Sequence, residues 1–472
     1  MNLSLFCMHS TRLAAAIIAL LIPSLPSSVA AQTPPETQPD AVQVPDFLNP
    51  HPNPLLVPTR PEEVKIQRTQ PITLAEALEL AKRNNRELQV SILELERSRS
   101  ALRESQAVLF PNVDVLTGLT NRGDGFTGDA SQSSTSFNGE ARINYDLYTS
   151  GNRRASIRAA EEQLRIDELD VENRSLEIRL NVTTQYYNLQ EADEQVRINR
   201  SAVENSQASL RDAQARERAG VGTRFDVLQS QVNLANAQQS LTSSLSNQRI
   251  ARRQFAALLN LAQSAEISAA DAVQVAGLWQ QTLEESIIQA FQNRPELPQA
   301  LAQANISEQQ RRQALSQLGP QISLNGIYNV FDGFDDGVSL TDGYSVGLRA
   351  SLTLFDGGAA RARAAQSKVN IAIAQSQFAS QREQIRFDVE QFYAQLQSNL
   401  DNIQTSGVAL NQAREALRLA RLRFDAGVGT QTDVIFAEND LTRAEGNRVS
   451  AILDYNRALA NLQRTVTFRS VR

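Results

Sequence analysis

The chain has 472 residues and a formal net charge of −6, and it contains two histidines and one cysteine. All three of those residues precede Asn53, so the rest of the chain has no side chain for Ser-His or Cys-His catalysis and none for the common zinc sites. Catalysis by paired carboxylates remains possible, although an acidic pair on a long helix is usually a solvated face, and we expect no cofactor and no metal site. An acidic chain without a clustered basic segment also makes a nucleic-acid partner unexpected.

The first 71 residues divide into a signal peptide and a proline-rich tail. Arg12 is followed by an apolar run from Leu13 to Ile22 and by small residues that end at Ala31. This pattern is typical of a secretion signal over residues 1–31, and the run is too short for a membrane-spanning helix. Residues 32–71 hold ten of the sixteen prolines. We predict an extended or disordered tail there, with a strap lying over the outside of the body as the alternative.

Residues 72–260 form the first of two structural units. Thr73 with Glu76 makes a capping box, which predicts one helix from Thr73 to Phe110. A weakly alternating strand is expected at residues 113–120. A clearer strand at residues 137–147 alternates apolar or small residues with polar ones, and the polar positions are Asn138, Glu140, Arg142, Asn144 and Asp146. Period two places the two sets on opposite faces of the strand.

The longest predicted helix follows these strands. Residues 152–219 contain neither proline nor glycine, and a helix of that length spans roughly 100 Å. Apolar residues recur along it every seven residues, at Val182, Leu189, Val196, Val203 and Leu210, which predicts supercoiling against neighbouring helices. The pentapeptide AGVGT at residues 219–223 is the predicted turn at the tip of a helical hairpin. A return helix is expected at residues 223–259.

The same series recurs after an irregular connection at residues 261–281. AGVGT appears again at residues 426–430, an offset of 207 (426 − 219 = 207). The second heptad seam keeps this offset and consists of Val389, Leu396, Ile403, Leu410 and Leu417. Alternating strands are expected at residues 322–330 and 344–354. One unit has therefore been duplicated, and the second copy spans residues 282–467, followed by a short tail at residues 468–472.

The helix lengths favour a mainly α protein with β-hairpins at one end. In each unit the first and third helices together are about as long as the second. The first helix can therefore run up to the strands, the second from the strands to the tip, and the third back to meet the start of the first near residues 261–281. The result is a long helical wall with strand hairpins at one end and two tips at the other.

The alternating strands favour a transmembrane barrel shared between copies of the chain. Four strands cannot close a barrel, so several copies around a common axis are expected. The apolar faces then meet lipid, and the polar faces line a wet lumen with Glu140, Arg142, Asp146 and Arg349. The alternative, a soluble antiparallel sheet, needs an apolar layer over one face, and the sequence has no spare element for that layer.

From Thr73 to Thr467 the chain resembles the TolC-like outer-membrane efflux proteins, the outer membrane factor family. The resemblance rests on TLAEAL from Thr73, the proline-terminated first helices, LFDGG from Leu354, and the glycine tips followed by Asp-Val. It implies a homotrimer with an α-helical tunnel and a shared 12-stranded β-barrel in outer-membrane lipid. It also implies an exit duct, not an enzyme, for a tripartite efflux pump or a type I secretion system. The expected partners are a periplasmic adaptor (a membrane fusion protein) and an inner-membrane transporter.

The resemblance further implies roles for residues at the tips. The docking surface for the adaptor falls on Gly220, Val221, Gly222, Thr223, Gly427, Val428, Gly429 and Thr430. Asp226 corresponds to a latch aspartate and Asp433 to one in the tunnel constriction. Phe424 and Gln431 stand where the best-known members have a tyrosine and an arginine, so the latch is expected to rely less on ion pairs. Phe436 replaces a second constriction aspartate.

Simpler explanations exist for some of these residues. The tip glycines turn the chain whether or not a partner docks there, because glycine tolerates positive φ at helix ends. Phe436 is either part of an apolar constriction or a buried residue of the helix seam.

Two other functions fit parts of the sequence. A trimeric coiled-coil surface adhesin or structural envelope protein would share the long helices. The duplicated hairpins and the two separate strand pairs speak against it. A soluble periplasmic hairpin adaptor would share the coiled coil, but it gives no reason for strands with an apolar outer face.

Overall fold

The computed structural model describes residues 48–51, 53, 55–66, 68–123, 133–334 and 340–466. All of them belong to one compact unit, Val44–Arg472. The predicted signal peptide, residues 32–47 of the predicted tail and residues 467–472 lie outside the described residues.

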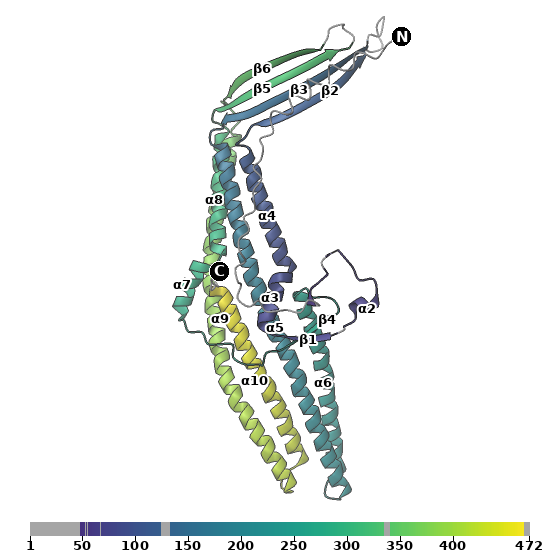
Figure 1. Cartoon of the computed structure of the whole chain (residues 1–472). Helices are drawn as coiled ribbons and strands as arrows, with labels where there is room; N and C mark the ends of the chain where they lie inside the picture. Colours follow the sequence, from purple (N-terminus) through teal and green to yellow (C-terminus); the bar gives the residue numbers. More distant parts are fainter. Residues whose placement is uncertain are drawn as a thin grey trace, which may run out of the picture. The chain divides into compact units, whose positions relative to one another are not determined.

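The elements run in two series of the same order (Figure 1). The first consists of α3 (Leu74–Asn84), α4 (Arg86–Ala107), β2 (Asn112–Gly123), β3 (Ser133–Tyr148), α5 (Asn152–Arg218) and α6 (Arg224–Leu258). The second consists of α7 (Leu283–Asn293), α8 (Glu296–Ser316), β5 (Gln321–Gly333), β6 (Thr341–Ser351), α9 (Ala359–Asp425) and α10 (Gln431–Val466). The two long helices, α5 and α9, have 67 residues each, so both predicted long helices form at full length.

The single helix predicted from Thr73 to Phe110 is wrong, because the chain breaks at Asn85. This residue has an extended backbone (φ −68°, ψ 123°), and its side chain accepts a hydrogen bond from the Leu88 amide to cap α4. In the second series the break falls at Arg294, just before Pro295. A residue before proline is disfavoured in the helical region, so the sequence does signal this second break.

Part of the predicted tail is ordered and belongs to the core. Leu48 is fully buried, a short helix α2 (Pro61–Val64) follows, and β1 (Arg68–Ile72) pairs in parallel with β4 (Ala265–Ala269). The connection at residues 261–281 is therefore partly a strand. Residues 68–71 are extended, as the prediction allowed, but they are not a disordered tail, because β1 pairs with β4 and Ile72 and Ile267 are both buried there.

The third helix of each series meets the break in the first helix, not its start. The Asn260 side chain beyond α6 donates to the Asn84 carbonyl at 3.1 Å. In the second series the Asn293 side chain donates to the Val466 carbonyl at 3.5 Å. The end of α6 therefore lies at the beginning of α4, while α3 packs beside α5.

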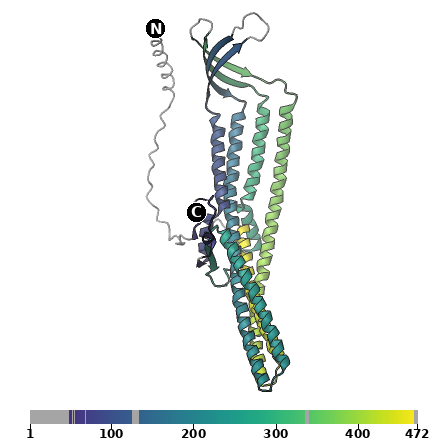
Figure 2. The ribbon, with the colours of Figure 1, turned by 90° about the vertical axis from the view of Figure 1, so that its right-hand side faces the viewer.

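The long helices lie side by side in the order α4, α5, α8, α9 near the sheet (Figure 2) and in the order α6, α5, α10, α9 toward the tips (Figure 1). Four of the five members of each heptad seam are buried, as predicted; Leu210 and Leu410 are half-buried. The largest core cluster surrounds Tyr186, whose hydroxyl donates to the Asp271 carboxylate at 2.7 Å. This cluster joins α3, α5, α6 and β4 midway along α5.

The sheet has the strand order β2-β3-β5-β6, and all pairs are antiparallel. In the register, Asp146 lies opposite Ser323, which lies opposite Arg349. Residues directly opposite each other point to the same face, so Arg349 shares a face with Asp146, Glu140 and Arg142. The four polar residues predicted to line a lumen therefore lie on one face of the sheet. Tyr145, Leu324 and Leu348 occupy the other face.

Candidate functional site

Each tip of the two hairpins is a helix end closed by a glycine. After α5, Gly220 has φ +76°, and the Val221 and Gly222 amides both donate to the Arg216 carbonyl, at 3.0 and 3.1 Å. After α9, Gly427 has φ +74°, and the Val428 and Gly429 amides both donate to the Arg423 carbonyl at 2.9 Å. This is the Schellman arrangement, in which a left-handed residue lets the chain cover the last carbonyls of the helix.

The second glycine of each tip is required for a different reason. A Cβ on Gly222 would lie 2.9 Å from the Arg216 Cβ. A Cβ on Gly429 would lie 3.0 Å from the Phe424 amide nitrogen and 3.1 Å from the Arg423 Cβ. The backbone folds back against the last turn of the helix so closely that no side chain fits. Both glycines of AGVGT therefore have a structural role at each tip.

The threonine that ends each pentapeptide caps the return helix. The Thr223 hydroxyl accepts a hydrogen bond from the Asp226 amide at 3.2 Å, and the Asp226 carboxylate accepts one from the Thr223 amide at 3.1 Å. Thr430 and Asp433 make the same pair of bonds at 3.1 and 3.0 Å. These are reciprocal capping boxes. The hydrogen bond from the Thr430 amide holds the pKa of the Asp433 carboxyl below its usual value.

The apex of each tip exposes one apolar side chain. Val221 is 75% exposed and Val428 is 70% exposed, although the rest of each turn is bonded into its own hairpin. Phe225 adds a further exposed apolar surface beside the first tip. The two tips therefore present rigid, apolar ends rather than mobile polar loops.

The residues predicted to form the gate do not all meet within one chain. Phe424 packs under Arg216 of α5, whose guanidinium carbon lies 4.1 Å from the ring centroid. Arg216 also forms an ion pair with Asp425 at 3.1 Å. The expectation of a less ionic contact missed this pair, because Arg216 and Asp425 are 209 residues apart in the sequence.

Gln431 is buried between the two hairpins. Its side-chain nitrogen donates to the Ser230 hydroxyl of α6 at 3.1 Å. The hydroxyl of the next residue, Thr432, donates to the Gln229 side chain at 2.9 Å. Gln431 therefore joins the second hairpin to the first, whereas Asp226 is bound to its own helix cap.

Phe436 is not a buried seam residue. It is 63% exposed in the single chain, while Val434, Ile435 and Ala437 around it are buried. The buried side of α10 therefore lies on the opposite side of the helix from Phe436. The simpler explanation of Phe436 is wrong for the single chain, and its exposed ring is available to another surface.

Sequence reasoning missed a polar cluster around Glu438, two residues beyond Phe436. Glu438 is only 4% exposed, and one carboxylate oxygen accepts hydrogen bonds from Ser209 at 2.8 Å and from Arg421 at 3.0 Å. Arg421 also donates to Asn205 at 3.1 Å. The only available signal was that Glu438 follows Gln431 by seven residues and so shares its helix face.

The four sheet residues form no cluster of four. Arg142 and Glu140 make an ion pair at 2.5 Å along β3. Arg349 and Asp146 are separated by Ser323 in the register. The face carries charges of both signs, which suits a wetted surface.

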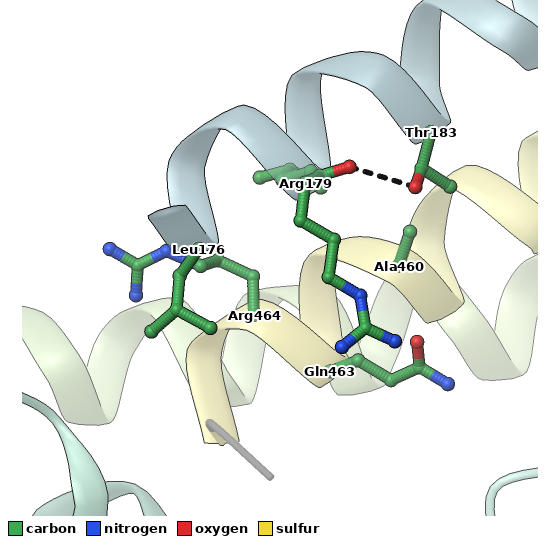
Figure 3. Close-up of a pocket in the computed structure, with 7 residues that line it drawn as sticks. Leu176, Arg179, Thr183, Ala460, Gln463 and Arg464 are labelled. Carbon is green, nitrogen blue, oxygen red and sulfur yellow. Dashed lines mark hydrogen bonds between the residues drawn. The ribbon is translucent and has the colours of Figure 1, made fainter. Parts of the chain in front are cut away.

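A separate hollow of about 220 Å³ lies between α5 and α10 (Figure 3). Leu176, Arg179 and Thr183 of α5 face Ala460, Gln463 and Arg464 of α10, and the Arg179 side chain extends toward Gln463. The Thr183 hydroxyl donates to the Arg179 carbonyl at 2.8 Å. None of the predicted site residues lines this hollow, so it belongs to the helical wall.

The described residues contain neither a membrane-spanning helix nor a cluster of metal ligands. Among the helices in this part of the chain, none is both long and apolar enough to cross a membrane. No group of three or more His, Cys, Asp or Glu side chains that could hold a metal ion occurs among the described residues.

Comparison with known proteins points to one family and one fold. A family model described as outer membrane efflux protein matches residues 77–261 and 286–466, well over half of the chain. The structure of the outer membrane protein VceC from Vibrio cholerae is 19% identical, with a TM-score of 0.71 over 83% of this chain and 95% of VceC. No curated protein sequence matches the chain.

Two further structures are similar to the same extent. The CmeC outer membrane channel from Campylobacter jejuni is 16% identical, with a TM-score of 0.70 over 89% of this chain and 94% of CmeC. The open state of the MtrE outer membrane channel from Neisseria gonorrhoeae is 18% identical, with a TM-score of 0.69 over 90% of this chain and 97% of MtrE. At such low identities the likeness establishes the fold.

Proposed function

The chain belongs to the outer membrane efflux protein family, and from this we propose that it forms the outer-membrane exit duct of a tripartite efflux pump or a type I secretion system. Three copies build a shared barrel in the outer membrane and a helical tunnel in the periplasm. A periplasmic adaptor and an inner-membrane transporter deliver the substrate to the tunnel. The transporter supplies the energy, and the duct itself catalyses no reaction.

One observation carries this proposal. The two longest helices each join an amphipathic sheet at one end to a glycine tip at the other (Figure 1). Such a helix of 67 residues spans roughly 100 Å. A soluble domain has no need for that separation, whereas a duct that leads from the outer membrane to partners in the periplasm requires it.

The two faces of the sheet support the membrane end of the proposal. Val115, Tyr344, Val346 and Leu348 on the apolar face are between 70% and 83% exposed. A soluble protein would cover such a row of apolar side chains. We assign lipid to this face and the wet lumen to the face with Glu140, Arg142, Asp146 and Arg349.

The free edges of the sheet support assembly of several copies. β2 and β6 are the outer strands of the four-stranded sheet. Their free edges need partners, because unpaired backbone groups are not tolerated in lipid. Joining β6 of one copy to β2 of the next closes a barrel of twelve strands in a trimer.

The tips fit the docking and gating roles. We assign adaptor docking to Gly220, Val221, Gly222 and Thr223 and to Gly427, Val428, Gly429 and Thr430, because rigid apolar ends suit contact with another helical hairpin. We assign gating to the contacts that hold the hairpins together, those of Phe424 and Gln431. Asp226, Asp433 and Phe436 complete the gate, with Asp433 and Phe436 forming rings around the constriction in the trimer.

Single-channel recording tests the proposal. Full-length protein is extracted from membranes with detergent and added to a planar lipid bilayer, and native mass spectrometry counts the copies in the same preparation. We expect stepwise conductance from a complex of three copies. Recovery of the protein in the soluble fraction, with no conductance, would overturn the proposal.

A further inference from the structure

A basic pocket lies where β3 passes into α5. Its volume is about 700 Å³. Arg153, Arg154 and Arg158, all from the first two turns of α5, contribute to its wall, and Glu161 is the one acidic residue that lines it. Neither the tips nor the lumen uses these arginines.

The arginines are available to an outside anion. Among the described residues, the Arg153 guanidinium donates to the backbone carbonyls of Val108 and Leu147, both at 3.3 Å. Within the described part of the chain, no ion pair is recorded for Arg154 or Arg158, and both are exposed. The pocket therefore carries a net positive charge that the described residues do not neutralise.

The pocket opens on the apolar side of the sheet. The Arg153 guanidinium carbon lies 5.8 Å from the centroid of the Tyr145 ring, and Tyr145 is on the apolar face. The register shifts between Asp146 and Tyr148, so that Tyr148 lies opposite Ile322. This bulge returns Tyr148 to the apolar face and places its ring in the pocket wall.

Apolar and aromatic side chains make up part of the remaining wall, beside Thr149 and Ser150. Leu109, Leu147 and Tyr148 line the pocket and are each between 45% and 50% exposed. The pocket thus combines guanidinium groups with a half-exposed aromatic and aliphatic surface. A ligand with a negatively charged oxygen group beside a hydrocarbon chain matches both the guanidinium groups and the apolar surface.

The second repeat supplies its own anion at the equivalent place. Asp356 lies 207 positions after Thr149, and its carboxylate accepts hydrogen bonds from the Gly358 amide at 2.9 Å and the Ala360 amide at 2.7 Å. In the first repeat, the Thr149 hydroxyl accepts only a long bond of 3.4 Å from the Arg153 amide. The same backbone turn therefore holds a carboxylate in one repeat and lacks one in the other.

The arginines near this turn also differ between the two repeats. Arg153 and Arg158 of the first repeat correspond to Ala360 and Ala365 of the second. Arg361 keeps the position of Arg154 and Arg363 is additional, so the first repeat has three arginines and a neutral threonine here, whereas the second has two arginines and its own carboxylate. The first repeat therefore has an anion site that the chain does not fill.

We propose that the pocket lined by Arg153, Arg154, Arg158 and Tyr148 binds the phosphate headgroup of an anionic phospholipid. The assignment of lipid as the source rests on the proposed function, which puts the strands in the membrane and α5 in the periplasm. The junction then lies at the depth of the headgroups of the inner leaflet. Arginine forks bind phosphate with two parallel hydrogen bonds, and tyrosine is favoured at this depth.

A binding measurement with detergent-extracted full-length protein tests the site. The probes are dioctanoyl phosphatidylglycerol, dioctanoylglycerol, which lacks the phosphate, and inorganic phosphate. Arg154→Gln/Arg158→Gln removes two of the three guanidinium groups and keeps Arg153, which holds the turn. Arg361→Gln/Arg363→Gln is the matched control, because it removes the same charge from the first turns of α9.

We expect phosphatidylglycerol to bind the wild type and the control variant equally. Its dissociation constant should rise about tenfold or more in Arg154→Gln/Arg158→Gln. Equal affinity in that variant, or an equal loss in the control variant, would overturn the proposal. Dioctanoylglycerol binding as tightly as phosphatidylglycerol would also overturn it, and inorganic phosphate binding as tightly would show that the source is free phosphate.

A second variant tests the site without removing an arginine. Thr149→Asp introduces the carboxylate that Asp356 supplies in the second repeat, so it should weaken phosphatidylglycerol binding as strongly while the thermal midpoint stays the same or rises. Unchanged binding in Thr149→Asp contradicts the proposal. Planar-bilayer conductance of the same preparations separates the two proposals, since a conducting channel that binds no phospholipid overturns only this one.

Discussion

Arg216 of α5 stacks over the ring of Phe424 in α9 at 4.1 Å and pairs with Asp425 at 3.1 Å. One side chain of the first repeat therefore holds two consecutive residues of the second repeat, directly before the second tip. Together with Gln431 and Ser230, it joins the two hairpins near their ends. The hairpins meet there through side chains and not through a shared backbone turn.

Removal of Arg216 should loosen this contact. Arg216→Gln loses the cation–π contact and the ion pair, which together contribute about 1 kcal/mol at such a partly exposed position. We expect a small fall in the thermal midpoint and a larger single-channel conductance. Arg211→Gln is the control, because Arg211 is an exposed arginine on the same helix. Equal conductance of the Arg216→Gln and Arg211→Gln variants would show that the contact does not restrain the tips.

Alanine at a tip glycine and alanine at a glycine inside a helix should have opposite effects on stability. Gly222→Ala places a Cβ 2.9 Å from the Arg216 Cβ, and we expect it to destabilise the protein by about 1–3 kcal/mol through overpacking. Gly446 lies within α10, and a Cβ there meets only the Gln195 side chain at 3.8 Å. Gly446→Ala should therefore stabilise by about 0.5–1 kcal/mol. Thermal unfolding in detergent, followed by circular dichroism, measures both, and changes of the same sign would contradict the tip geometry.

The cap at the start of α10 should depend on pH. The amide hydrogen bond from Thr430 lowers the pKa of Asp433 in the folded state. A lowered folded pKa means that the cap stabilises the protein above the unfolded pKa of the carboxyl, and that this stability is lost as the pH falls through the folded pKa. The difference in thermal midpoint between wild type and Asp433→Asn should thus be present at neutral pH and disappear at strongly acidic pH. A difference that stays constant with pH would show that the charge does not matter.

The two faces of β6 should respond differently to arginine. Val346→Arg puts a charge on the apolar face, where we expect a cost of about 2–4 kcal/mol near the middle of the bilayer. Ser345→Arg puts the same charge one residue away on the polar face, where water and Arg349 are already present. The amount of folded protein in the outer-membrane fraction should fall for Val346→Arg only. Equal recovery of both variants would contradict the assignment of lipid to the apolar face.

Much of the helical framework could be read from the sequence. The heptad residues from Val182 to Val203 are buried as their spacing predicts, because a seven-residue period fixes which face of a long helix meets its neighbours. The pentapeptides mark both tips, because only glycine tolerates the positive φ of Gly220 and Gly427. The alternation in β3 likewise predicts one polar face, since successive side chains point to opposite sides.

The predictions failed mainly where distant segments meet. Asn85 breaks the first helix with a cap that an asparagine in a helical pattern does not announce, and β1 forms only because β4 pairs with it across the sequence. Phe436 is exposed because α10 buries the other side of the helix, and that side is set by the packing of α10 against α9 and α5. The Asn85 cap is a local contact with Leu88, whereas the other two outcomes are set by the packing of distant segments.

The sequence by itself determined the duplication, the lengths of the two longest helices, the tips and the two faces of the strands, because each depends on local backbone preferences or on a short period. The tertiary structure alone decided the contact between Arg216 and Phe424, the burial of Gln431 and Glu438, and the pocket at Arg153. Those features join residues that are far apart in the chain or depend on a single bulge at Tyr148. Their geometry arises from the packing of whole helices and strands, which no short stretch of sequence specifies.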